Sequence, residues 1–128
     1  MNPAVPALAA GRVLIGGGLL AKPSLTAAPW VGRDAGRAGT RVFARALGAR
    51  DLVLGLQTLA ALRRGGDPRP LLLAGAAVDL ADGWATFADQ SRLPRRARLL
   101  AGAVACAAAA GELALAATTS RAGSPSRP

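Results

Sequence analysis

Six ionisable residues stand inside stretches of the chain that are otherwise apolar. In the middle of a membrane-crossing helix, each unpaired charge of this kind costs about 2.5–3.5 kcal/mol. We therefore expect the six side chains to pair with one another in a buried charge network. Acids at such positions also carry protons or cations through membranes, so the same residues are candidates for transport. The charge network consists of Arg12, Arg50, Asp51, Asp79, Asp82 and Glu112.

The sequence lacks the residue types that most catalytic and metal sites need. It contains no histidine and a single cysteine, Cys106. Imidazole metal ligands, Ser-His or Cys-His catalytic pairs and an intramolecular disulfide are therefore excluded. We predict no catalytic residue, no metal ion and no cofactor, and we expect that the protein is not an enzyme.

One acidic segment has a partial likeness to an enzyme signature. Between Gly75 and Gly83, a Gly-x-x-x-Asp sequence and an Asp-Gly pair resemble the CDP-alcohol phosphotransferase motif. The Ala-Arg that follows in that motif is replaced by Thr86 and Phe87, and its later pair of aspartates is missing. We therefore do not interpret the segment as a metal site.

Four apolar blocks carry the ionisable residues, at about 4–21, 42–62, 70–88 and 99–118. Each block has roughly 18–21 residues, close to the number that an α-helix needs to cross the hydrocarbon of a bilayer. The longest connection, 23–40, is expected to lie along the membrane surface. The predicted fold is all-α, a four-helix transmembrane bundle with short connections and one longer first loop. It forms a single domain over 1–118, and the tail at 119–128 is predicted to be disordered.

The composition suits helices that pack closely in lipid. Apolar residues make up 52% of the chain but aromatic residues only 3%, so small residues supply much of the apolar surface. The net charge of +9 does not indicate a nucleic-acid partner, because the basic residues are scattered between the blocks. The expected partners are the lipid bilayer and either a second copy of the chain or another membrane protein. The sequence identifies no small-molecule ligand.

The spacing of the acids suggests a partner for Arg50. Asp79 and Asp82 are three residues apart and share one helix face. A short turn at 65–69 makes the second and third helices antiparallel neighbours, so Arg50 comes close to the depth of Asp82. We therefore expect Arg50 to contact Asp79 or Asp82.

The other arginine has a different pair of candidate partners. Arg12 lies between the depths of Asp51 and Glu112, and we expect it to contact one of them. Two arginines then face four acids. Either one or two of the acids carry a proton, or another cation neutralises them. The network thus has two interpretations, a structural one and a path for protons or cations.

A longer segment resembles a group of membrane proteins. The sequence from Arg41 to Gly55, which contains Gly-Ala-Arg-Asp, and the helix with Asp79 and Asp82 resemble small, uncharacterised four-helix integral membrane proteins of GC-rich actinobacterial type. In those proteins a Gly-x-Arg-Asp/Glu segment stands at the start of the second helix, and an acidic pair marks the third. The resemblance extends over about residues 8–118. It implies the membrane fold but no activity, and it assigns no site residue.

Two alternatives remain open. Residues 1 to about 28 could be a cleaved signal peptide, with Ala27-Ala28 at the cleavage site, although the first basic residue is Arg12. The chain could also be a water-soluble four-helix bundle whose acids lie on solvated faces. Against this, Glu112 is the one charged residue in 99–118, which leaves that block without a polar face.

The connections indicate an orientation and a location. The first and third connections hold eight basic residues, whereas the second connection and the C-terminal tail, on the opposite side of the membrane, hold five. This difference favours both termini outside the cytoplasm. We predict a multi-pass protein of the bacterial inner membrane that acts as a structural or accessory component. The alternative is a proton- or cation-coupled transport element that uses the intramembrane acids.

Overall fold

The computed structural model describes residues 2–88 and 95–121, which are almost entirely helical with short connections and no strand among them. The all-α prediction is therefore confirmed. The predicted apolar blocks correspond to the four long helices. The elements are α1 (Ala4–Ala21), α2 (Pro23–Val31), a short 3-10 helix η1 (Gly32–Gly36), α3 (Ala38–Arg63), α4 (Arg69–Ala88) and α5 (Arg95–Arg121).

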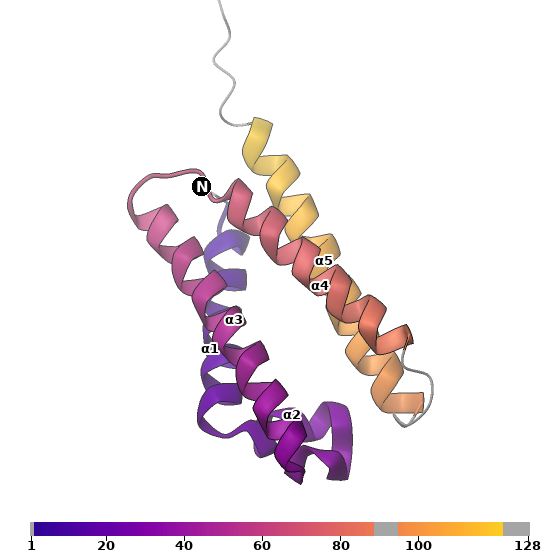
Figure 1. Ribbon diagram of the computed structural model, residues 1–128. Coiled ribbons are helices and arrows are strands. Elements are labelled where there is room, and N and C mark those ends of the chain that lie inside the picture. The colour runs from indigo at the N-terminus through magenta and orange to yellow at the C-terminus, as the bar shows by residue number, and fades with distance from the viewer. Residues whose placement is uncertain (1, 89–94, 122–128) are drawn as a thin grey trace, which may run out of the picture.

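The four long helices form two antiparallel pairs. α1 packs mainly along α3, and α4 packs mainly along α5 (Figure 1). The pairs lie close together where α4 begins and α5 ends, and they diverge towards the end of the molecule that carries α2. The end of α4 and the start of α5 therefore lie at the same end of the molecule as α2. The N-terminus and the turn between α3 and α4 lie at the other end.

Close backbone contact joins α1 to α3. A Cβ atom at Gly48 would lie 2.7 Å from the backbone oxygen of Gly16 and 2.7 Å from the Cβ of Leu19. No side chain fits in this space, so the two backbones touch directly. Small residues at such contacts let membrane helices gain dispersion energy where lipid gives no hydrophobic driving force.

The turn between α3 and α4 follows from its residues. Gly65 has a φ of 67°, a left-handed conformation that glycine adopts without steric cost. An Asp67 carboxylate oxygen then accepts a hydrogen bond of 2.9 Å from the backbone N–H of Arg69. Pro70 occupies the first turn of α4, where a missing N–H costs little. This turn holds the second and third long helices antiparallel, as the sequence indicated.

The first connection is more ordered than the predicted loop at 23–40. Pro23 stands at the first position of α2, and Gly32, with a φ of 59°, follows the last residue of that helix. Ala27 of α2 and Ala35 of η1 are buried in one apolar cluster with Leu19. The first loop is therefore largely a short helix and a 3-10 turn packed on the long helices. Its small apolar residues are ordered because they bury apolar surface of α1 and α3.

Two long helices extend beyond their predicted bounds. α3 begins at Ala38 rather than at 42, and α5 runs from Arg95 to Arg121 rather than from 99 to 118. The prediction of a disordered tail from residue 119 is therefore wrong for its first three residues. The rest of that tail, 122–128, lies outside the described residues. Helices continue past their apolar blocks because Arg, Ala and Thr accept helical geometry once neighbouring turns have formed.

Three of the four long helices, α1, α4 and α5, are long and apolar enough to cross a membrane. α3 has sufficient length, but its charged residues lower its hydropathy below that of the others. Length and composition thus support three of the four predicted membrane-crossing helices, and for α3 they do not show a crossing. The residues responsible lie between its start and its middle: Arg41, Arg45, Arg50 and Asp51.

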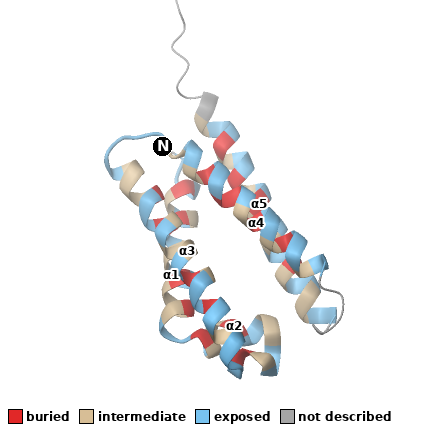
Figure 2. Ribbon diagram, viewed as in Figure 1, coloured by how far each residue is buried: buried red, intermediate tan, exposed pale blue. Residues whose placement is uncertain are grey.

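Many large apolar side chains are exposed, whereas the acids Asp79 and Glu112 are buried. Phe43, Leu14 and Trp84 are 78%, 76% and 74% exposed, whereas Glu112 is only 1% exposed. Buried residues lie along the faces where the helices meet (Figure 2). A water-soluble bundle would have the opposite distribution, with acids on the solvated faces. The arrangement suits a protein whose surroundings are lipid.

Candidate functional site

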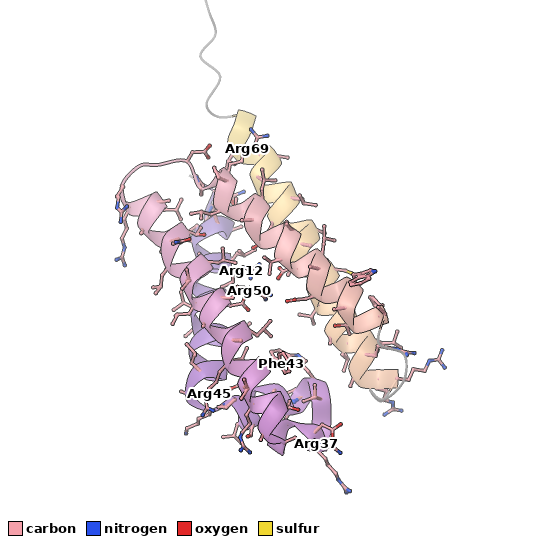
Figure 3. All side chains as sticks on the ribbon, viewed as in Figure 1. Arg12, Arg37, Phe43, Arg45, Arg50 and Arg69 are labelled. Atoms are coloured by element: carbon pink, nitrogen blue, oxygen red, sulfur yellow. The ribbon has the colours of Figure 1, made fainter. Side chains whose placement is uncertain are left out.

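Arg12 lies at the centre of the charge network. It projects from the middle of α1 to the region between the two helix pairs (Figure 3). Its Nη1 donates to Oδ1 of Asp51 on α3 at 2.8 Å, and its Nη2 donates to Oδ2 of Asp79 on α4 at 2.7 Å. Its Nε donates to Oε1 of Glu112 on α5 at 2.9 Å. One side chain of α1 is thus bonded to each of the other three long helices.

These contacts are largely shielded from solvent. The Glu112 side chain is 2% exposed, and those of Arg12, Asp51 and Asp79 are 10–13% exposed. Hydrogen bonds between ionised partners are short and strong, and a low local dielectric strengthens them further. A buried charge that loses its partner is correspondingly costly. Arg12 therefore holds three acids in the protein interior, and for Asp79 and Glu112 it is the one arginine bonded to them among the described residues.

Arg50 forms the outer part of the charge network. Its two terminal nitrogens bond the two carboxylate oxygens of Asp82, at 3.1 Å and 2.8 Å, in a fork. Nη2 also donates to Oδ1 of Asp51 at 3.2 Å. Because the same Asp51 oxygen accepts from Arg12, it links the two arginines. The Arg50 and Asp82 side chains are 29% and 37% exposed, so this pair is weaker than the inner contacts.

A glycine on α4 makes room for the most deeply buried acid. A Cβ atom at Gly75 would contact both carboxylate oxygens of Glu112. The second of these oxygens, Oε2, is buried and has no hydrogen-bond partner among the described residues, and the same holds for Nε of Arg50. The hydrogen-bonding capacity of the network is therefore not fully used, and the carboxylate of Glu112 keeps one acceptor oxygen without a donor among the described residues.

The formal charges of the network do not balance. With every group ionised, two arginines and four acids give a net charge of −2. A network with this excess negative charge can bind a proton or a cation next to Glu112. The carboxylates are arranged around the Arg12 guanidinium, and among residues 2–88 and 95–121 no three His, Cys, Asp or Glu side chains are grouped so as to hold a metal ion.

A partly open cavity of about 470 Å³ lies beside the network, between α1, α2 and α3. Its wall is almost entirely apolar and includes Trp30, Phe43 and Leu47. Arg50 is the one network residue in this wall, and none of the four acids lines it. In Figure 3 Phe43 and Arg50 lie on the side of α3 that faces the other helix pair. The acids are thus bonded to arginines without access to this cavity.

The structure brings all six residues of the predicted network together. Arg12 contacts both acids offered as alternatives, and it also contacts Asp79. Of the two candidates for Arg50, only Asp82 is bonded to it. Sequence reasoning missed the contact of Arg12 with Asp79. It also missed the space that Gly75 provides, for which the available signal was a glycine four residues before Asp79 on the same helix face.

Comparison with known proteins found no similarity, since no family model, no curated protein and no solved structure matches the chain.

Proposed function

We propose that the protein is a structural or accessory component of the bacterial inner membrane, in which all four long helices cross the bilayer. The observation that carries this proposal is the contact of Arg12 with acids on α3, α4 and α5. A side chain of α1 that is bonded to each of the other three long helices serves first to fix the arrangement of the four helices. Its partner would be another membrane protein or a second copy of the chain, bound in the plane of the bilayer.

The length and charge pairing of α3 support its inclusion as the fourth membrane helix. Its 26 residues extend about 39 Å at 1.5 Å per residue, more than the ~30 Å thickness of the hydrocarbon. Its central charges, Arg50 and Asp51, are paired inside the protein. Arg41 and Arg45 lie near its first residue, where long side chains reach the headgroup region. α3 can therefore cross the bilayer once the other helices shield its charges.

Orientation follows from the distribution of basic residues between the two ends. The end of α4 and the start of α5 lie at the same end of the molecule as α2. The first and third connections of the sequence together hold eight basic residues, against five in the second connection and the tail. The positive-inside rule then places this end in the cytoplasm and both termini outside it. The resemblance to small actinobacterial membrane proteins supports the same membrane location and adds no activity.

Two measurements test the structural role. The first is an alkaline wash of membranes, in which the chain should stay with the lipid fraction. The second compares Arg12→Ala with Arg63→Ala, where Arg63 is exposed at the end of α3. Arg12→Ala should sharply reduce the folded protein recovered from membranes, and Arg63→Ala should not. Release by the wash, or equal recovery of the two variants, contradicts the proposal.

Proton or cation transport is the second candidate function. The observation that favours it is the excess of acids over arginines, together with the unpartnered Oε2 of Glu112. A proton or cation at this oxygen would reduce the excess negative charge. Purified protein in liposomes should then conduct protons, and Asp79→Asn should change the rate. If folded wild-type protein gives no flux of protons, Na⁺ or K⁺, the transport function is eliminated and the structural role is unaffected.

A further inference from the structure

We propose that the cavity between α1, α2 and α3 binds an acyl chain of an anionic phospholipid, with the lipid phosphate held among the basic residues at the α2 end. This inference concerns a lipid site beside the charge network and does not depend on what the network does.

The wall of the cavity fits an apolar chain. Leu19, Ala27, Val31 and Leu47 contribute aliphatic surface, and Trp30 contributes an aromatic ring. The volume of about 470 Å³ falls within the range of ligand-binding cavities, about 300–1,000 Å³. A polar ligand would lose its hydrogen bonds to water in this space without replacement, whereas an acyl chain loses none.

The length of the cavity matches one leaflet. Its lining positions on α3 include Thr40, Phe43, Leu47 and Arg50, which share one helix face. From Thr40 to Arg50 the helix rises about 15 Å, which is half of the ~30 Å hydrocarbon thickness. The cavity therefore extends from the α2 end of the molecule towards the middle of the membrane, as one acyl chain does.

Arg50 lines the inner end of the cavity but does not indicate that an anionic group of the ligand binds there. Its guanidinium is already bonded to Asp82 and Asp51. A second anion at this depth would add to a network that already has an excess of negative charge. The ligand's charged group must therefore lie at the other end of the cavity, near the headgroup region.

The α2 end supplies the complementary charge. Between residues 22 and 45 there are five basic residues and one acid, Asp34, which is paired with Arg37 at 2.8 Å. Clusters of four or more basic residues next to a membrane helix attract anionic lipids. Trp30 in the cavity wall is of the residue type that favours the headgroup region. The basic residues are Lys22, Arg33, Arg37, Arg41 and Arg45.

Trp30 provides the readout for an experiment. In a full-length Trp84→Phe chain it is the remaining tryptophan, and Trp84 is 74% exposed, so its replacement leaves the fold intact. This chain is reconstituted in vesicles in which either phosphatidylglycerol or phosphatidylcholine carries brominated acyl chains. Quenching of Trp30 by each lipid at equal mole fraction gives their relative affinity. We expect phosphatidylglycerol to bind about fivefold more tightly or better, since each basic residue near a lipid surface contributes about that factor.

Two pairs of variants locate the site. Ala44→Phe fills the cavity and should bring the relative affinity to about 1, whereas Ala49→Phe, on an exposed face of the same helix, should leave it unchanged. Removing the basic residues in Arg33→Gln/Arg37→Gln should lower the preference for phosphatidylglycerol, and Arg63→Gln/Arg64→Gln at the opposite end should not.

Equal quenching by the two lipids in the Trp84→Phe chain without further changes overturns the proposal. So does a preference that survives both Ala44→Phe and the double change at Arg33 and Arg37. If Ala44→Phe reduces the folded yield, the surface arginine pairs still decide the result, because Arg33 and Arg37 are exposed.

Discussion

The carboxylate of Glu112 on α5 occupies the space that a side chain at Gly75 on α4 would need. Glu112 is 1% exposed, and its Oε1 also accepts a hydrogen bond from Arg12. Gly75 thus sets how far Glu112 can reach towards α1. The two residues act as one packing unit between the helices of the second pair.

Alanine at Gly75 should therefore destabilise the protein by displacing Glu112. We expect a loss of about 1–3 kcal/mol, the usual cost of overpacking, measured as unfolding in detergent micelles. In a Glu112→Ala background the same change should cost little, because the carboxylate is gone. Gly17→Ala is the control, since a Cβ there meets no atom within 4 Å. Equal losses from Gly75→Ala in both backgrounds contradict this relationship.

Neutralising an arginine of the network should cost more than neutralising an acid. Arg12→Gln leaves the buried carboxylates of Asp79 and Glu112 without their cation, whereas Asp51 keeps Arg50. Breaking buried pairs in this way costs about 3–5 kcal/mol. Glu112→Gln keeps an amide oxygen for Arg12 and lowers the excess negative charge, so its loss of stability should be much smaller. Unfolding of the two variants in the same detergent makes the comparison. A larger loss for Glu112→Gln shows that the imbalance of charge is not a cost in the folded protein.

Lysine should not replace Arg12. The guanidinium presents donors in a planar fork and reaches acids on three helices, whereas an ammonium group is a single point of charge. Arg12→Lys should reduce the yield of folded protein nearly as much as Arg12→Ala. Arg50→Lys should have a milder effect, because the Arg50 side chain is 29% exposed. Similar yields for wild type and Arg12→Lys mean that charge alone, without the fork, holds the helices.

Cysteine labelling can decide whether α3 crosses the membrane. In a Cys106→Ala background, Gly36→Cys precedes α3 and Gly66→Cys follows it, and both positions are exposed. A membrane-impermeant maleimide should label the two cysteines from opposite sides of intact vesicles. The same reagent applied after detergent lysis should label both and controls for reactivity. Labelling from one side alone would place α3 along the surface and remove the four-crossing topology.

Helix positions were predictable where the sequence carries local stop signals. α1 has its predicted bounds because Lys22 and Pro23 follow the apolar block directly. α4 begins within one residue of the expected position because Pro70 marks its first turn. α2 was missed because Pro29 and nearby glycines suggest a loop, although Pro23 was a start signal. In α2, burial of small residues such as Ala27 against the long helices outweighs these weak local preferences.

The members of the network were predictable from their charge, but the pairing was only partly so. A charge in an apolar block must be compensated, whichever way the helix faces. Which acid Arg12 meets depends on the rotation and tilt of each helix, and depth along the chain does not determine these. Depth alone left Asp79 and Asp82 as alternatives for Arg50, and the structure joins Asp82 to Arg50 and Asp79 to Arg12. The position of Gly75 on the same helix face as Asp79 was the one sequence signal for the space there, and it does not identify Glu112 as the side chain that fills it.

The contact between Arg12 and Glu112 also has a consequence for synthesis, since the two residues are 100 positions apart in the chain. At translation rates of about 5–20 residues per second, α1 waits on the order of 5–20 seconds before the ribosome has made Glu112. During that interval Arg12 lacks a hydrogen-bond acceptor that it has in the finished protein. The nascent chain is then vulnerable to proteases that recognise unassembled membrane segments, and a stall before α5 would extend that exposure.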